Sequence, residues 1–184
     1  MDISHLHTGS YRTFTAYRKS KVIYDLTYHF CQKYLHRGDR TIDQMVQAAR
    51  SGKQNIIEGK EAARTSYETL LKLINVARAS LQELLEDYED YLRVRNLRLW
   101  SKESIEVEAM RKLGREHNDS DYFLALAESR NDEVVANMVI VLICQADVLL
   151  DRYRKSQEAK FVQEGGFREK LTRERVAYRQ NYNK

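Results

Sequence analysis

A regular apolar repeat between residues 70 and 91 is the feature that most constrains how this chain can fold. Its apolar positions are spaced alternately four and three residues apart: Leu70, Ile74, Ala77, Leu81, Leu84, Tyr88 and Tyr91. This heptad spacing puts all of these side chains on one face of an α-helix. Such a face packs against neighbouring helices at a shallow left-handed angle. The segment therefore predicts a long helix inside a helical bundle.

The composition of the whole chain also favours helices. Its 184 residues include no proline and 7 glycines, while Leu, Ala, Glu, Lys, Arg and Gln recur at helical spacing. We therefore predict an all-α protein, built as an antiparallel up-and-down four-helix bundle over residues 16–164. A loose lead-in at residues 1–15 precedes the bundle, and a helical suffix at residues 165–184 follows it.

Breaks in the apolar periodicity delimit the other main helices. The first covers residues 16–36, the second runs from residue 42 to a stop at Gly59, and the fourth covers residues 133–163. Two patterns are typical of capping boxes at helix starts. They are Thr41 with Gln44 and Thr65 with Glu68.

Residues 101–130 carry too few apolar side chains for a central helix. Ser101 is expected to cap a short helix that ends near residue 116, and another helical turn or two is expected at 122–130. We predict that this segment lies as an excursion on the surface of the bundle. Asn131 or Asp132 is then expected to cap the last main helix.

Small residues on the second helix predict a close neighbour. Ala48 and Gly52 lie four residues apart on one face of this helix. A glycine in mid-helix costs about 1 kcal/mol relative to alanine. Its expected benefit is the close approach of another helix backbone.

Asn55 and Glu58 lie one turn apart, just before Gly59. They allow two interpretations: a ligand site, or a polar clasp that ties the helix end to the amides of Ser66 and Tyr67. We favour the clasp, because polar groups near helix ends are normally satisfied in this way.

The run from residue 134 to residue 150 is apolar nearly all round the helix. As a helix it would span about 25 Å, less than the roughly 30 Å of membrane hydrocarbon. It also contains Asn137, Gln145 and Asp147, so we interpret it as a buried helix and expect no membrane association. Because a single bundle rarely surrounds one helix so completely, we infer that one flank faces another subunit.

Two cysteines, Cys31 and Cys144, lie far apart among apolar neighbours. We interpret both as reduced core residues. The first residues also lack the basic start and apolar run of a secretory signal. The sequence therefore predicts a cytoplasmic protein.

The net charge of +4 is unevenly distributed. Residues 1–64 and 151–184 carry an excess of basic side chains, and residues 65–150 carry an excess of acidic ones. Two interpretations are open. The basic side chains could be solvated and form ion pairs with the acidic segment, or they could contact the phosphates of a nucleic acid. The candidate contact residues are Arg18, Lys19, Lys21, Arg50, Lys53, Lys60, Arg64, Arg168, Lys170, Arg173, Arg175 and Arg179.

No arrangement typical of catalysis or metal binding is found in the sequence. Glu83, Glu86 and Glu89 could suggest a carboxylate metal site, but a di-metal bundle needs Glu-x-x-His pairs, which are missing. The histidines have no ligand spacing beyond the loose His5 and His7 pair. Because no nucleophile grouping or phosphate-binding glycine loop occurs either, we expect no enzyme activity, no metal and no cofactor.

Several short blocks in and around the helical hairpin 40–90 resemble a known family. These blocks are Ala48-Ala49-Arg50, Asn55-Ile56-Ile57-Glu58-Gly59, Ser66 with Glu68, Ala77-Arg78-Ala79-Ser80-Leu81, and Glu83-Leu84. In their order and spacing they resemble the four-helix-bundle family of proteins encoded in intervening sequences of 23S ribosomal RNA genes. The extra segment at 101–130 and the C-terminal tail are similar to a longer branch of that family, which carries a suffix.

The resemblance implies an antiparallel four-helix bundle that assembles as a ring-shaped homopentamer, with no enzymatic activity. The chain is also distantly similar to the accessory variability protein of diversity-generating retroelements, a basic pentamer implicated in nucleic-acid binding. We interpret a set of residues in and around the hairpin as a structural motif. They are Ala48, Gly52, Asn55, Glu58, Gly59, Ser66, Glu68 and Ser80.

Two functional hypotheses follow from these observations. The first is a non-enzymatic homo-oligomeric scaffold, a pentamer by resemblance, whose basic surface binds RNA or DNA without sequence specificity. The second is a protein-interaction adaptor whose C-terminal tail, residues 165–184, docks on a partner and which has no nucleic-acid role.

Overall fold

The computed structural model describes residues 11–63, 65–165 and 167–182, and every regular element among them is helical. These residues form seven α-helices and one short 3-10 helix, η2 (Tyr11–Thr13), with no strand in the part described. The prediction of an all-α protein is therefore confirmed.

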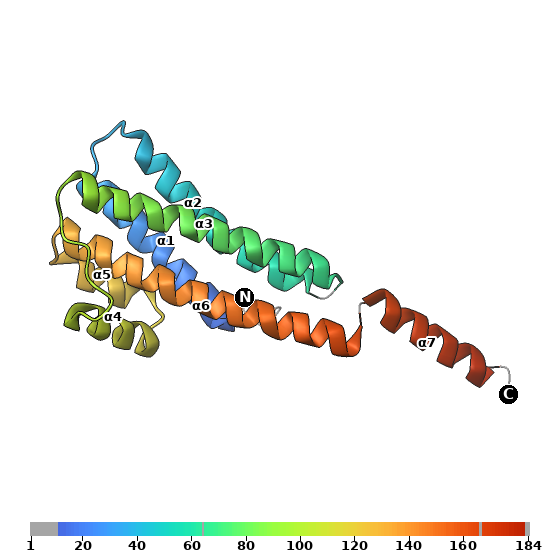
Figure 1. The fold of residues 1–184 in the computed structure, drawn as a ribbon. Helices are drawn as coiled ribbons and strands as arrows, with labels where there is room; N and C mark the ends of the chain where they lie inside the picture. Colours follow the sequence, from blue (N-terminus) through green and yellow to red (C-terminus); the bar gives the residue numbers. More distant parts are fainter. Residues whose placement is uncertain (1–10, 64, 166, 183–184) are drawn as a thin grey trace, which may run out of the picture.

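Four long helices make a closed ring of neighbours. They are α1 (Thr15–Tyr34), α2 (Arg40–Ala62), α3 (Tyr67–Val94) and α6 (Asp132–Glu164). Helix α1 packs against α2 and α6, and α3 packs against the same two helices. Figure 1 shows that each of the four runs opposite to the one before it along the chain.

Two shorter helices cover one side of this ring (Figure 1). Helix α4 (Ile105–Glu116) packs against α6, and α5 (Ser120–Glu128) packs against α1. The last helix, α7 (Phe167–Tyr182), extends beyond the end of α6 and away from the ring. All side chains of residues 171–180 on α7 are exposed.

The heptad face of α3 forms the centre of the core, as predicted. Each of its positions from Leu70 to Tyr91 is 5% exposed or less. Phe30 of α1 meets the rings of Tyr88 and Tyr91 edge-on, with centroid distances of 5.0 and 4.8 Å. The buried Tyr88 hydroxyl donates a hydrogen bond to Thr27 Oγ1 at 3.1 Å, so its polar atom is satisfied inside the core.

The first half of α6 is buried on all sides within this one chain. Every residue from 135 to 143 is buried, because α4 covers the side of α6 that the ring leaves open. Within the described residues α6 is long and apolar enough to cross a membrane, but 61% of its most apolar window is buried inside the molecule. The inference that one flank faces another subunit is therefore not needed for residues 135–143.

Asn137 holds the connection between α3 and α4 against α6. Its side chain accepts a hydrogen bond from the Trp100 amide and donates to the carbonyls of Arg98 and Glu133, each at 2.8 Å. The side chain is 1% exposed and fully satisfied. It therefore fixes where the chain leaves the ring and begins α4.

Two predicted capping boxes are wrong, because residues beside the predicted caps occupy the capping positions. Asp39 caps α2 and accepts from the Thr41 amide at 2.9 Å. Ser66 caps α3 and accepts from the Thr69 amide at 3.2 Å. In both cases the cap is the residue whose extended backbone lets its side-chain oxygen reach a free amide. Glu68 is exposed.

The capping residues predicted for α4 and α6 have different outcomes. Ser104, and not Ser101, caps α4 by accepting from the Val107 amide at 3.2 Å. Asn131 caps α6 by accepting from the Val134 amide at 3.0 Å, which confirms one of the two residues predicted there.

Gly59 does not end α2, and the predicted polar clasp is not formed. The helix continues to Ala62, and Gly59 lies buried within it. The Asn55 amide group donates to the Ser51 carbonyl at 2.9 Å, while Glu58 is exposed. The Ser66 amide donates to the Ala62 carbonyl at 2.8 Å. Backbone bonds of the turn have therefore replaced the clasp.

The predicted close approach at Gly52 is confirmed, and the neighbour is α3. A Cβ at position 52 would lie 2.9 Å from the side chain of Leu81, which is closer than carbon atoms normally pack. Beside this contact the hydroxyls of Ser51 and Ser80 lie 2.9 Å apart. Small side chains on α2 therefore let the two helices of the hairpin pack closely.

Replacing Gly52 by leucine should reduce stability, because the new side chain would force α2 and α3 apart. We expect Gly52→Leu to lower the free energy of unfolding by about 1–3 kcal/mol, the usual cost of overpacking a core. Urea unfolding followed by circular dichroism measures this change. The matched control is Ala79→Leu, which puts the same side chain on the exposed face of α3. Equal stability of the two variants would contradict the close-packing argument.

Candidate anion-binding site

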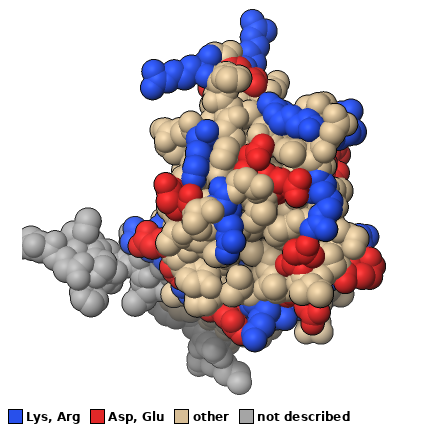
Figure 2. Space-filling model, turned by 90° about the vertical axis from the view of Figure 1, so that its left-hand side faces the viewer, with Lys and Arg blue, Asp and Glu red and all other residues tan. Residues whose placement is uncertain are grey.

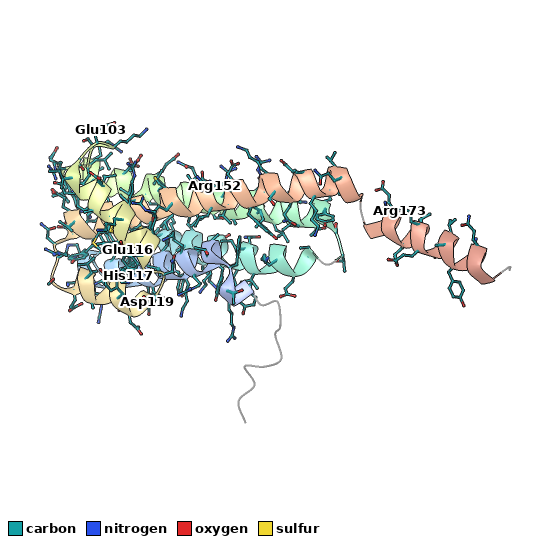
Figure 3. All side chains as sticks on the ribbon, turned by 90° about the horizontal axis from the view of Figure 1, so that it is seen from below. Glu103, Glu116, His117, Asp119, Arg152 and Arg173 are labelled. Atoms are coloured by element: carbon teal, nitrogen blue, oxygen red, sulfur yellow. The ribbon has the colours of Figure 1, made fainter. Side chains whose placement is uncertain are left out.

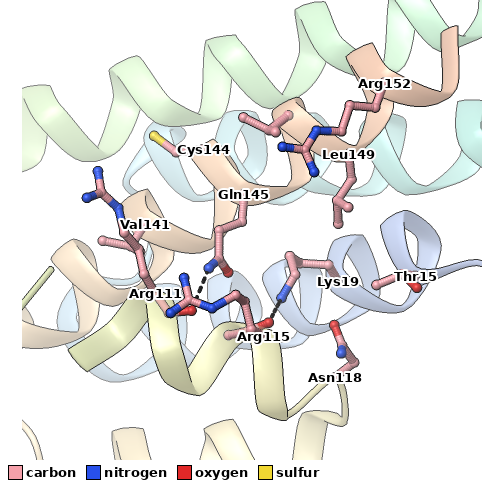
Figure 4. A pocket seen from close by; sticks show the side chains of 12 residues that line it. Thr15, Lys19, Arg111, Arg115, Asn118, Val141, Cys144, Gln145, Leu149 and Arg152 are labelled. Atoms are coloured by element: carbon pink, nitrogen blue, oxygen red, sulfur yellow. Dashed lines mark hydrogen bonds between the residues drawn. The ribbon is translucent and has the colours of Figure 1, made fainter. Parts of the chain in front are cut away.

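A hollow of about 420 Å³ lies between α1, α4 and α6 (Figure 4). Its polar lining combines basic and amide side chains: Lys19, Arg111, Arg115, Asn118, Gln145 and Arg152. None of the described residues that line it is an aspartate or glutamate. This combination favours an anionic ligand.

The hollow is basic because α6 sends its acidic side chains to a different face. Asp147 and Asp151 point toward α3, where both pair with Arg78. Arg78 Nε lies 2.6 Å from Asp147 Oδ1, and Arg78 Nη1 lies 3.2 Å from Asp151 Oδ1. Hydrogen bonds from Lys155 and Arg154, together with the nearby charge of Arg78, lower the pKa of Asp151 to about 2. The face of α6 that turns to α4 keeps Gln145 and Arg152.

Lys19 forms the floor of the hollow. The residue is 3% exposed, and its ammonium group donates to the carbonyl oxygen of Gly114 near the C-terminal end of α4. Burial lowers the pKa of Lys19 to about 8. No carboxylate among the described residues forms an ion pair with it, so the hollow holds a buried cation whose charge is only partly compensated.

Two buried acceptor atoms also lie at the hollow. Gln145 donates through Nε2 to the Arg111 carbonyl at 2.9 Å, and its Oε1 lies against Gly114. Among the described atoms this Oε1 and Asn118 Oδ1 are buried and have no hydrogen-bond partner. Gly114 makes room for this arrangement, because a Cβ there would collide with the Gln145 side chain. Buried acceptors without donors are rare in native proteins.

Three arginines surround the opening. Arg111 donates to the Lys102 carbonyl at 3.2 Å. Arg115 and Arg152 are exposed, and in the described part of the chain neither forms an ion pair. Figure 3 shows Arg152 on α6 and labels Glu116 and Asp119 at the turn between α4 and α5.

A second hollow of about 550 Å³ adjoins the first and shares Asn118 with it. Its lining includes Arg18 and Lys21 of α1 beside Tyr11 and Tyr17, whose rings meet edge-on at 4.8 Å. Asp119 and Asp121 also line it, and Asp119 is engaged as the cap of α5. We use the name basic surface for the exposed side chains around both hollows. The name refers to five of the exposed basic ones: Arg18, Lys21, Arg111, Arg115 and Arg152.

The structure brings another group of the predicted contact residues together at the edge of this surface. Burial lowers the pKa of Lys53, and the nearby positive charges of Arg50 and Lys21 lower it further. The Lys53 ammonium lies 3.9 Å from the centre of the Tyr24 ring. Arg50 is exposed. The basic surface therefore continues from α1 toward α2.

Two other predicted contact residues are not available as exposed cations. Lys19 is buried at the first hollow, so it does not belong to the exposed cations of the basic surface. Lys60 is half-buried, with its ammonium 5.0 Å from the ring centres of both Phe14 and Tyr153. Aromatic rings hold it there by cation–π attraction.

The remaining predicted residues belong to other parts of the chain. Arg64 and the side chains of Arg168 and Lys170 lie outside the described residues. Arg175 and Arg179 are exposed on α7, as is Arg173, and Figure 3 shows this helix apart from the basic surface. Residues of α7 therefore do not extend the basic surface within one chain.

Sequence reasoning missed the arginines and amides that line the first hollow. Arg111 and Arg115 are four residues apart on α4, and Gln145 and Arg152 are seven apart on α6, so each pair occupies one helix face. These spacings were a usable signal. Counting the net charge of each segment concealed this signal, because the acidic residues of 65–150 outnumber the basic ones.

Metal binding and thiol chemistry have less support among the described residues than anion binding. These residues contain no group of three or more His, Cys, Asp or Glu side chains that could hold a metal ion. Cys31 is buried as predicted, but Cys144 is exposed at the edge of the first hollow, so its prediction as a core residue is wrong.

At the end of the molecule where α1 joins α2, Figure 2 shows basic (blue) and acidic (red) side chains interspersed.

Comparison of the chain with known protein families, with curated proteins and with solved structures finds no match.

The buried Lys19 should make stability rise with pH in the alkaline range. Its pKa is about 8 in the folded protein and about 10.5 when unfolded, so between these values the unfolded chain binds more protons. The free energy of unfolding of the wild type relative to Lys19→Met should therefore increase by about 2 kcal/mol from pH 7.5 to pH 10.

Urea unfolding in phosphate-free buffer at several pH values measures this difference. Lys72→Met, which replaces an exposed lysine of α3, is the matched control and should show no such increase. If the difference between the wild type and Lys19→Met stays constant across this range, Lys19 is not desolvated as described.

Proposed function

We propose that this chain is a non-enzymatic, cytoplasmic binding protein that holds nucleic acid by its phosphate backbone, without reading base sequence. Its ring of α1, α2, α3 and α6 would be the antiparallel four-helix bundle of the resembled family. The observation that carries the proposal is the basic surface, whose exposed arginine and lysine side chains surround two adjoining hollows beside α1.

Phosphate contacts explain why such a surface would bind polyanions with little specificity. Exposed arginine and lysine side chains neutralise phosphates and release counterions, which supplies most of non-specific affinity. Base sequence is read by contacts to base edges, usually from an element inserted into a groove. The basic surface presents flexible cations around two hollows on packed helices, so positioning without base readout is the expected mode.

We also propose that the protein is a homo-oligomer, with the pentamer of the resembled family as the expected state. Support comes from a hollow of about 430 Å³ along α2 and α3, where Ala48, Ser51 and Ser80 lie beside Glu83 and Asp87. No described residue of α2 or α3 lines the two hollows of the basic surface, so a neighbouring copy could pack on this side and leave the basic surface free. Repetition of the basic surface around a ring would raise affinity for one long ligand.

A second candidate function is that of an adaptor that docks on a protein partner through α7. The observation that favours it is the exposure of apolar side chains on this helix, with Leu171, Val176 and Tyr178 each at least 41% exposed. An amphipathic helix of this kind often binds in a groove of a partner.

Removing charge from the basic surface should weaken nucleic-acid binding. We expect the triple substitution Arg18→Gln, Lys21→Gln and Arg115→Gln to lower affinity at least tenfold at low salt and to reduce the salt slope by about 2. Fluorescence anisotropy with labelled RNA and DNA hairpins, titrated at low and raised salt, measures both quantities.

The matched control removes the same charge elsewhere, by Arg37→Gln, Arg40→Gln and Lys72→Gln, all at exposed positions. It should leave affinity within about threefold and should leave the oligomeric state unchanged. Absence of binding by the wild type at low salt would remove the nucleic-acid proposal. Equal losses in the two triple variants would mean that net charge, and not this surface, carries binding.

Deleting residues 165–184 separates the two candidate functions. If the basic surface carries binding, the truncated protein should keep its nucleic-acid affinity within about threefold, because α7 lies apart from that surface. Light scattering on the purified protein at micromolar concentration gives the oligomeric state in the same experiment. A monomeric wild type would end the oligomer proposal, and a large loss of affinity on truncation would assign the binding to α7.

A further inference from the structure

The first hollow is too deep for the internal backbone of a nucleic acid. Lys19 at its floor is 3% exposed, so its ammonium group can meet only a ligand that enters the hollow. An internal phosphodiester is flanked by sugars on both sides and would lie across the opening. A chain end or a free nucleotide carries its phosphate on one side only. A volume of about 420 Å³ is also in the usual range for small-ligand pockets.

The charges around the hollow favour a doubly charged group. Lys19 lies at the floor, Arg115 and Arg152 lie at the opening, and no carboxylate lines the space among the described residues. A phosphate monoester carries close to two negative charges at neutral pH, whereas an internal phosphodiester carries one. The monoester therefore gains more from the same three cations.

The two buried acceptor oxygens without a hydrogen-bond partner indicate that the ligand also carries hydrogen-bond donors. Gln145 Oε1 and Asn118 Oδ1 are buried without donors. A dianionic phosphate has no hydrogen to give them, and a simple anion would leave them unsatisfied. The two ribose hydroxyls of a free nucleotide can donate to both, whereas a nucleotide at an RNA strand end keeps only its 2′ hydroxyl free and can donate to one of them. A ligand that combines a phosphate monoester with hydroxyl groups satisfies the whole site.

From this geometry we infer that the hollow binds the phosphate monoester of a nucleotide, either at the end of a nucleic acid strand or free in solution. Lys19, Arg115 and Arg152 hold the phosphate, while Gln145 and Asn118 accept from the ribose hydroxyls, two of a free nucleotide or one of an RNA strand end. The apolar wall of Val141, Val148 and Leu149 lies against the rest of the nucleotide. It contains no aromatic ring for stacking, so the identity of the base matters little. The inference rests on the site of the proposed function and names its ligand.

The test compares end groups on one sequence. A labelled single-stranded RNA is prepared with a monophosphate at the 5′ end, with a monophosphate at the 3′ end, or with hydroxyls at both ends. Anisotropy at moderate salt should show at least tenfold tighter binding of a phosphorylated form than of the hydroxyl form. Titration with adenosine monophosphate, with adenosine as its control, shows whether a free nucleotide binds as well as a strand end.

Variants tie the preference to the hollow. Arg152→Gln removes a cation at the opening, and Gln145→Leu removes an acceptor; each should reduce the preference for the phosphorylated end at least fivefold. Lys112→Gln removes an exposed charge of α4 that does not line the hollow, so it should leave the preference unchanged. Melting curves of all variants confirm that they are folded.

The affinity for adenosine monophosphate should also fall as the pH rises from 7.5 to 9.5, because Lys19 loses its proton while the phosphate keeps its charge. The other titratable groups that line the hollow with Lys19 are Arg111 and Arg115 of α4, and Arg152 and Cys144 of α6. Desolvation by the neighbouring side chains raises the pKa of Cys144, although part of its side chain is exposed. Lys19→Met should bind the nucleotide weakly and without this pH dependence.

The outcomes separate this inference from the proposed function. Equal binding of phosphorylated and hydroxyl ends would overturn the inference and leave backbone binding intact. Selective binding of adenosine monophosphate without affinity for any hydroxyl-ended strand would support the inference and end the nucleic-acid proposal. A preference for the phosphorylated end that survives in Arg152→Gln and Gln145→Leu would also overturn the inference, because another site would then hold the phosphate.

Discussion

The burial of α6 on every side is the constraint on which the rest of this structure depends. In a ring of four helices each member faces solvent on its outer side, yet residues 135–143 of α6 have no polar face to offer. Helix α4 supplies the missing cover, and the hydrogen bonds of Asn137 to the chain at Arg98 and Trp100 fix where it begins. One polar residue in an apolar run thus determines the position of the segment that completes the core.

The placement of α4 in turn creates the basic hollow. A helix ends in carbonyl groups that have no partner inside the helix, and here one of them, that of Gly114, meets a side chain of the ring. Lys19 donates to the Gly114 carbonyl, and Gln145 donates to the Arg111 carbonyl. The partial negative charge at the end of α4 makes a buried ammonium tolerable without a carboxylate. The same contacts that attach α4 to α1 and α6 therefore leave a cation and an unpaired acceptor at the hollow.

The features predicted well from the sequence are those that depend on one helix or on two adjacent ones. The heptad face of α3 and the close approach at Gly52 follow from periodicity and side-chain size, and both are present. The caps at Asp39 and Ser66 were missed by one or two positions, because several polar residues in a row can serve and only the backbone geometry selects one. The hollow joins residues of α1, α4 and α6, so no local pattern contains it.

The charge of the hollow shows why composition alone is a poor guide to binding in such a protein. Residues 65–150 are acidic as a segment, yet they contribute Arg111 and Arg115 to the basic surface. Pairing of Asp147 and Asp151 with Arg78 on the α3 side removes the acidic groups of α6 from the side that faces α4. What a ligand meets is the charge on one face after such internal pairing. A chain with a net charge of only +4 can therefore present a strongly cationic site, provided that its helices sort acidic and basic residues onto different faces.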